Sequence, residues 1–132
     1  MRRPALVLTF VLLSAGLVLP GCIFAAAAVV AAVAVGVVSY ENNEAWMDYK
    51  GTLDQLWTAT LKAMRKLGYV VPGDPKPNAT EGTIEVGETR VVVETHAGGY
   101  VRVRVRVGTF TSEDNERKAK LLIEEVTAQL PK

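Results

Sequence analysis

Few residues of this 132-residue chain have the types and spacing that catalysis or metal binding requires. His96 is the only histidine and lies beside the Ala97-Gly98-Gly99 turn. An exposed turn histidine without a catalytic role is favoured there over a general base. The sequence contains no zinc motif, calcium loop or glycine-rich phosphate loop. It therefore predicts a protein that is not an enzyme and that holds no metal or cofactor.

The arginines Arg102, Arg104 and Arg106 are the one set of charged side chains whose spacing indicates a contact surface. They alternate with valines, so in a strand they project from one sheet face at intervals of about 6.6 to 6.8 Å. Such a row could bind anionic lipid headgroups, glycan phosphates or an acidic partner protein. The alternative is a solvated face that Glu85 and Glu94 partly neutralise, through exposed pairs that contribute about 0 to 1 kcal/mol each.

The single cysteine, Cys22, ends a leader with the layout of a secretory signal. Arg2 and Arg3 form its basic start, residues 5–18 are apolar, and Leu19-Pro20-Gly21 precede the cysteine. This ending resembles the lipobox of bacterial lipoproteins, which implies cleavage before Cys22 and acylation of its sulfur. Two or three acyl chains anchor firmly, because each buried methylene contributes about 0.8 kcal/mol. The alternative is an uncleaved membrane anchor with an incidental cysteine.

The lipobox resemblance also implies a location for the mature chain. Ile23 and Phe24 follow the cysteine, and neither is the aspartate that retains lipoproteins in the inner membrane of many Gram-negative bacteria. The expected location is therefore the outer membrane, facing the periplasm. Loss of Arg2 and Arg3 with the leader reduces the 15 basic residues to 13, against 14 acidic ones. This balance gives no electrostatic case for a nucleic-acid partner.

Residues 23–38 form a second apolar segment that consists almost wholly of alanine, valine and glycine. A helix of this length would measure about 24 Å, which is shorter than the roughly 30 Å core of a bilayer. Small residues at four-residue spacing (Ala28, Ala32, Gly36) predict a membrane-embedded stalk that forms homo-oligomers. A flexible tether and a β-rich start packed on the domain are the alternatives. The polar segment 40–44 then divides the chain into a signal peptide (1–21), a lipidated stalk (22–40) and a folded domain (41–132).

The folded domain shows the patterns of five strands and two helices. A first strand is predicted at 45–50, and a helix then runs from a capping box at Thr52 and Gln55 to a glycine C-cap at Gly68. The remaining elements are a short strand at 69–71, a proline-rich exposed loop at 72–77, strands at 83–86, 89–95 and 100–107, and a helix capped by Thr111 or Ser112. The predicted order is β-α-β-β-β-β-α.

The last three strands are expected to form an antiparallel meander with a definite register. Opposite charges then face each other on one side of the sheet, and the valines fall on the other side. The apolar stripes of both helices can cover the valine side, which predicts a two-layer α+β sandwich with two helices on one face of an antiparallel sheet. The expected pairs are Val86 with Thr89, Glu85 with Arg90, Ile84 with Val91, His96 with Tyr100, Val93 with Val103, Val91 with Val105 and Glu94 with Arg102.

Three parts of the sequence together resemble a known family. They are the Ala/Val/Gly run after Cys22, the segment 56–64 followed by Leu67-Gly68, and the segment 103–110 before a helix with an acidic start. With these features the chain resembles the domain-of-unknown-function 3568 family of small bacterial lipoproteins, over essentially the whole mature chain. The resemblance implies the topology and the envelope location, and it assigns no activity and no site residues.

The expected function is that of a non-enzymatic envelope lipoprotein, held to the membrane by its N-terminal lipid and acting as an interaction or scaffolding module. Its partner would be an envelope protein, or an anionic lipid or glycan that contacts the arginine row. The alternative is a carrier that binds a lipid or other apolar ligand between the helices and the sheet. A cavity lined by Trp57, Met64 and the sheet valines would favour the carrier, whereas a packed core would count against it.

Overall fold

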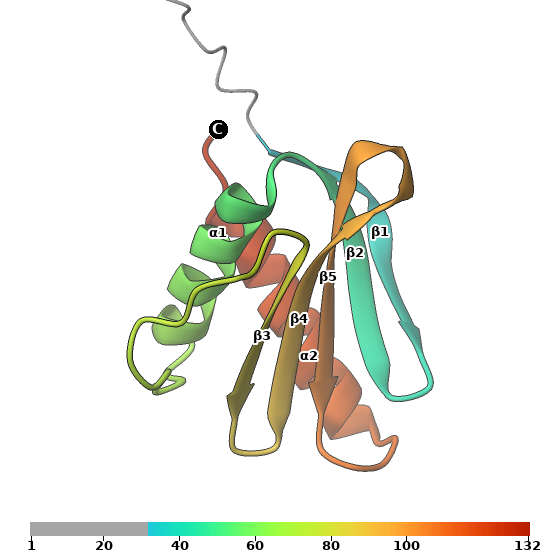
Figure 1. Ribbon diagram of the computed structural model, residues 1–132. Coiled ribbons are helices and arrows are strands. Elements are labelled where there is room, and N and C mark those ends of the chain that lie inside the picture. The colour runs from blue at the N-terminus through green and yellow to red at the C-terminus, as the bar shows by residue number, and fades with distance from the viewer. Residues whose placement is uncertain (1–31) are drawn as a thin grey trace, which may run out of the picture.

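A computed structural model describes residues 32–132 as one five-stranded antiparallel sheet with both helices on one of its faces (Figure 1). This confirms the predicted α+β class, the antiparallel sheet and the pair of helices. The predicted signal peptide (1–21), Cys22 and residues 23–31 of the predicted stalk lie outside the described residues. The strand order in the sheet is β1-β2-β5-β4-β3. The elements are β1 (Val33–Glu41), β2 (Glu44–Lys50), α1 (Leu53–Lys66), β3 (Glu81–Val86), β4 (Thr89–His96), the short 3-10 turn η1 (Ala97–Gly99), β5 (Tyr100–Val107) and α2 (Glu113–Ala128).

The strand β1 is the first difference from the sequence-based expectation. It occupies the second half of the predicted stalk and pairs antiparallel with β2, so the helical stalk is wrong for residues 33–38. Valine favours extended backbone, and Asn42 and Asn43 take the positive φ values of 52° and 63° that a tight hairpin turn requires. The predicted boundary at 40–44 is therefore a turn within the sheet. The folded unit begins before residue 41, and the element order is β-β-α-β-β-β-α.

The second difference is at residues 69–71, where the structure has no strand. The helix α1 ends in a Schellman motif, with Gly68 at a φ of 89°. The Tyr69 amide donates to the Met64 carbonyl at 2.9 Å, and the Gly68 amide donates to the Arg65 carbonyl at 3.1 Å. The backbone that follows the helix is therefore bound to the helix end and does not join a strand ladder.

The predicted register of the meander is confirmed, and so are the predicted helix caps. Thr52 and Gln55 form the capping box of α1, and Ser112 caps α2. Within residues 32–132, neither helix is long and apolar enough to cross a membrane. The observed pairs include Val86 with Thr89, Glu85 with Arg90, Ile84 with Val91, His96 with Tyr100, Val93 with Val103, Val91 with Val105 and Glu94 with Arg102.

One hydrophobic core lies between the helices and the inner face of the sheet. The helix α2 packs on β1, β2 and β5, and α1 packs on β4, β5 and α2 (Figure 1). Each strand contributes every second residue to this core, and each helix contributes one stripe. The fully buried side chains include Tyr49, Val91, Val93, Val103 and Val105 from the sheet, and Leu56, Met64, Leu122, Ile123 and Val126 from the helices.

Trp57 fills the space between α1 and β3 and is only 4% exposed. Gly82 of β3 lies against its ring, and a Cβ atom at that position would overlap the indole. The indole Nε1 donates to the Pro75 carbonyl at 3.0 Å and so holds the proline-rich loop against the helix. Trp57 is therefore a residue of the packed core.

Tyr49 places a hydroxyl inside the core, where it contacts α2. Its oxygen lies 2.9 Å from the Thr127 Oγ1 atom and donates to the Ile123 carbonyl at 3.4 Å. Burial raises the pKa of Tyr49 to about 12, from an ordinary value of 10.0, because the charged phenolate is poorly solvated there. Tyr49 therefore stays neutral to a higher pH in the folded domain than in the unfolded chain.

We predict that the domain loses up to about 2.7 kcal/mol of unfolding free energy as the pH rises from 10 to 12. The unfolded chain releases the Tyr49 proton near pH 10, whereas the folded chain holds it to about pH 12, so the contribution is complete below pH 10. Urea unfolding at a series of alkaline pH values measures this slope. Tyr49→Phe keeps the ring without the proton and should show a shallower slope, and equal slopes would contradict the prediction.

Candidate functional site

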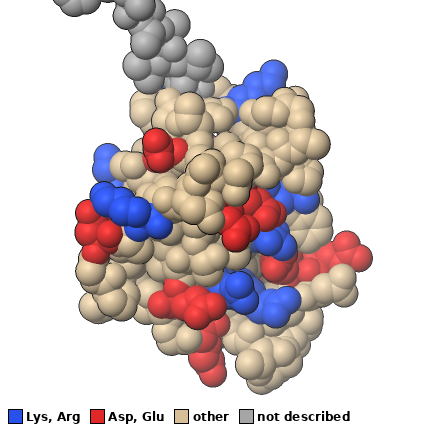
Figure 2. All heavy atoms as spheres, in the orientation of Figure 1, with Lys and Arg blue, Asp and Glu red and all other residues tan. Residues whose placement is uncertain are grey.

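The outer face of the sheet is the surface that the helices leave uncovered, and it carries the predicted arginine row. Acidic and basic side chains are interspersed on the face that Figure 2 shows. The arginines of β5 lie between the carboxylates of β2 and the side chains of β4, because β5 is the central strand. The face is therefore built from long-range strand pairing, and the environment of each arginine depends on which neighbour lies beside it.

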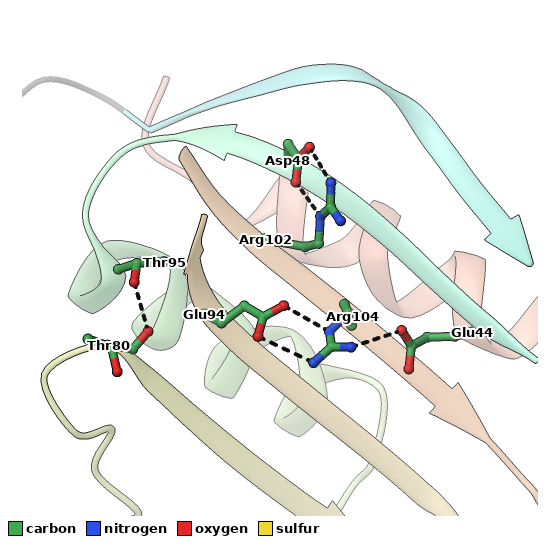
Figure 3. Close-up of polar contacts among 7 residues, drawn as sticks. All are labelled: Glu44, Asp48, Thr80, Glu94, Thr95, Arg102 and Arg104. Atoms are coloured by element: carbon green, nitrogen blue, oxygen red, sulfur yellow. Dashed lines mark hydrogen bonds and ion pairs between the residues drawn. The ribbon is translucent and has the colours of Figure 1, made fainter. Parts of the chain in front are cut away.

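Arg102 is held by Asp48 of β2 in a two-point contact (Figure 3). The Nε atom donates to Oδ1 at 2.7 Å, and Nη2 donates to Oδ2 at 2.9 Å. This hydrogen bond holds the pKa of Asp48 below its usual value and raises the pKa of Arg102. Their side chains are only 29% and 25% exposed, so Arg102 is engaged within the fold and is not free to meet a partner.

Arg104 lies between two carboxylates, one from each neighbouring strand (Figure 3). Its Nη1 atom is 3.4 Å from Glu44 Oε1, and its Nη2 atom is 3.3 Å from Glu94 Oε2. The Nε atom is buried and lies 3.0 Å from Glu94 Oε1, but its N–H is not aligned to form a hydrogen bond. Arg104 is therefore neutralised by ion pairing, with part of its donor capacity unused. Glu94 faces Arg102 along the backbone, but its side chain reaches Arg104.

Arg106 differs from the other two arginines because it is exposed and takes part in no ion pair within residues 32–132. Arg90 lies directly opposite it on β4, and in the described part of the chain its one ion pair is with the exposed Glu85, at 3.4 Å. Arg90, Arg104 and Arg106 line a cleft of about 220 Å³ together with Val92 and Glu44, which we call the arginine cleft. Sequence analysis named Arg104 and Arg106 as site residues but missed Arg90. The predicted register already placed Arg90 opposite Arg106, and this was the signal that could have found it.

The other candidate residues do not join this cleft. His96 is exposed at the end of β4, opposite Tyr100. Among the described residues, no group of three or more histidine, cysteine, aspartate or glutamate side chains could hold a metal ion. Cys22, the predicted lipidation site, precedes the described part of the chain.

Replacing Asp48 with Asn should destabilise the domain by about 1 to 3 kcal/mol, because Arg102 would lose its charged hydrogen-bond acceptor. The Asp48 pKa lies below its ordinary value of 3.8, so the stabilisation is complete above that pH and is lost as the pH falls through the folded-state pKa. Urea unfolding at neutral and acidic pH measures both effects. Arg106→Gln removes one charge from the same face and should leave stability unchanged or higher, and equal losses in the two variants would refute this assignment.

The comparison with known proteins identifies a family and assigns no activity. A search of curated proteins found no match to this chain. The family model described as "Protein of unknown function (DUF3568)" matches residues 4–127, which is nearly the whole chain. The family that the sequence resembles is thereby confirmed: the chain belongs to the DUF3568 family of proteins of unknown function.

Proposed function

We propose that this protein is a lipid-anchored lipoprotein of the bacterial envelope that acts as a non-enzymatic interaction module. In this proposal Cys22 carries the lipid in the outer membrane, and the folded domain faces the periplasm. The observation that supports the binding role is the division of the sheet into two faces. The inner face is fully covered by α1 and α2, and the outer face, with its charged side chains and the arginine cleft, is uncovered (Figures 1 and 2).

The length of the tether supports a domain held near the membrane surface. Nine residues, 23–31, lie between Cys22 and Ala32, where the described chain begins. The ten residue steps from Cys22 to Ala32 span at most about 36 Å when extended, at about 3.3 to 3.6 Å per step. A domain on such a tether meets envelope partners close to the bilayer and samples a restricted range of distances.

The packed interior disfavours the alternative of a lipid carrier. A carrier needs an internal cavity of a few hundred Å³ between the helices and the sheet. Here Trp57 and Met64, the residues expected to line such a cavity, are buried among core side chains at 4% and 0% exposure. Gly82 leaves no space beside the indole ring. The interaction module is therefore the function that the geometry supports better.

The anchor is tested by the intact mass of the mature N-terminus from membrane fractions, with Cys22→Ala beside the natural chain. We expect a mature chain that begins at Cys22 and carries two or three acyl chains, because the leader ends in a lipobox-like segment. The Cys22→Ala variant should lack the acyl mass and leave the membrane more readily. An unmodified chain that still begins near Met1 would overturn the lipoprotein assignment.

The docking face is tested by photo-crosslinking in living cells from one position on each side of the domain. Thr83 is exposed on the outer face of β3, and Lys118 is exposed on α2. We expect defined adducts from Thr83, few from Lys118, and loss of the Thr83 adducts in the Cys22→Ala background. Equal adducts from both positions, or adducts that do not depend on Cys22, would count against an anchored module that binds through the sheet.

A further inference from the structure

We propose that the arginine cleft binds a phosphate group carried by a molecule outside the bilayer. The inference begins with the placement of Arg90 and Arg106, which are direct partners across β4 and β5 and share the outer face. Side chains in this relation have Cβ atoms about 4.5 to 5.5 Å apart, and like charges there destabilise a sheet. A bound anion removes this repulsion. The two arginines that destabilise the strand pairing therefore favour the binding of an anionic ligand.

The fold neutralises the other arginines of this face but leaves these two with little compensation. Asp48 holds Arg102 with two short hydrogen bonds, and Glu44 and Glu94 flank Arg104. Within residues 32–132, the one ion pair of Arg90 is the 3.4 Å contact with Glu85, and both of those side chains are more than half exposed. Exposed pairs of this kind contribute little to stability. Among the arginines of this face, weakly compensated charge therefore lies toward the Val107 end of β5.

The shape of the surface concentrates this charge. The arginine cleft holds about 220 Å³ around Val92, which is only 9% exposed. A second hollow of about 340 Å³ shares Arg90 and is bordered by the turns at Gly87-Glu88 and Gly108-Thr109. Charged side chains around an apolar floor strengthen the local field for a small anion. The neighbouring hollow provides room for the rest of the molecule that carries the phosphate.

The geometry of the donors favours phosphate over carboxylate. A guanidinium presents a planar fork that pairs with two oxygens at a time. A carboxylate has two oxygens and satisfies one fork, whereas a phosphate group has more oxygens and can accept from arginines on both sides. Arg104 contributes from the same strand as Arg106, and its 3.4 Å contact with Glu44 is long enough to be exchanged for a ligand oxygen. Because Glu44 is negatively charged and competes with the ligand for Arg104, it opposes phosphate binding.

The position of the cleft indicates the source of the phosphate, and this step rests on the proposed function. The described chain begins at Ala32, beside Val33, which pairs with Lys50, and Lys50 in turn pairs with Tyr100. Arg106 lies six positions after Tyr100 in β5, which is about 20 Å along the strand. The cleft thus lies toward the end of the sheet opposite to the point where the tether enters. A phosphorylated molecule on the far side of the domain fits this arrangement better than a headgroup of the anchoring membrane.

The test is a titration of the full-length chain in detergent micelles with inorganic phosphate, followed by calorimetry and by the NMR signals of the arginine Nε–H groups. We expect saturable binding that Arg90→Gln and Arg106→Gln each weaken at least tenfold. Glu44→Gln should tighten binding, which a purely structural role for Glu44 does not predict. Arg117→Gln is the matched control, because this exposed arginine of α2 contacts Asp114 and carries the same charge. The absence of saturation, or equal weakening in the control, would overturn the proposal.

Two further measurements keep the result interpretable. The melting temperature of Arg106→Gln in phosphate-free buffer should equal or exceed that of the natural chain, because the repulsion between Arg90 and Arg106 is relieved. Loss of binding in this variant would then not reflect unfolding.

Glycerol 3-phosphate and a soluble short-chain phosphatidylglycerol distinguish a phosphorylated molecule outside the bilayer from a lipid headgroup. Tighter binding of the lipid than of glycerol 3-phosphate would overturn the assignment to a molecule outside the bilayer. Failure of phosphate binding would leave the acyl mass on Cys22 and the crosslinks from Thr83 unaffected, so the two proposals fail separately.

Discussion

The alternation of valine and arginine along β5 is the constraint on which both faces of the sheet depend. Val101, Val103, Val105 and Val107 are all at most 6% exposed, and the three arginines project from the opposite face. Because side chains alternate with a period of two, a shift of one residue would bury three guanidinium groups, and each buried charge costs several kcal/mol. The central strand therefore sets the register of the core and the arrangement of the surface charges at the same time.

The neighbours of β5 then decide what each arginine does. Carboxylates from β2 and β4 reach Arg102 and Arg104, and they convert two charges of the row into contacts that hold three strands together. At the other end of the strand, Arg106 faces a second arginine in place of a carboxylate. The three arginines therefore look equivalent in the sequence but differ in the structure. Arg102 and Arg104 form ion pairs that stabilise the sheet, whereas the charge of Arg106 is available. This difference connects the packing of the sheet to the proposed binding role.

The two layers also separate stability from binding. The helices cover one face, where Trp57 packs against Gly82 and the Tyr49 hydroxyl contacts Thr127. Changes on the outer face therefore have little effect on the core, except at the ion pairs of Arg102 and Arg104 that join neighbouring strands.

The sequence by itself determined the elements that depend on local signals. The capping box at Thr52 and Gln55, the glycine end of α1 and the register of β3, β4 and β5 were all predicted, because short turns and strict alternation leave few other arrangements. The strand predicted at 69–71 failed because the end of α1 captured its backbone amide. The Asn-Asn turn was a local signal that was taken for a boundary.

Tertiary contacts, and no local signal, set the conformation of residues 33–38 and the pairing of β2 with β5. Residues 33–38 are compatible with a helix or a strand in isolation, and the available edge of β2 and the core contacts of Ala34, Val38 and Tyr40 make them extended. The position of β2 beside β5 joins segments more than 50 residues apart, as in the contact between Asp48 and Arg102. No local pattern encodes such a neighbour, because the free energy that selects it comes from burying the whole inner face at once. That choice of neighbour places Glu44 in the arginine cleft and leaves Arg106 without an ion pair among the described residues, and so defines the candidate site.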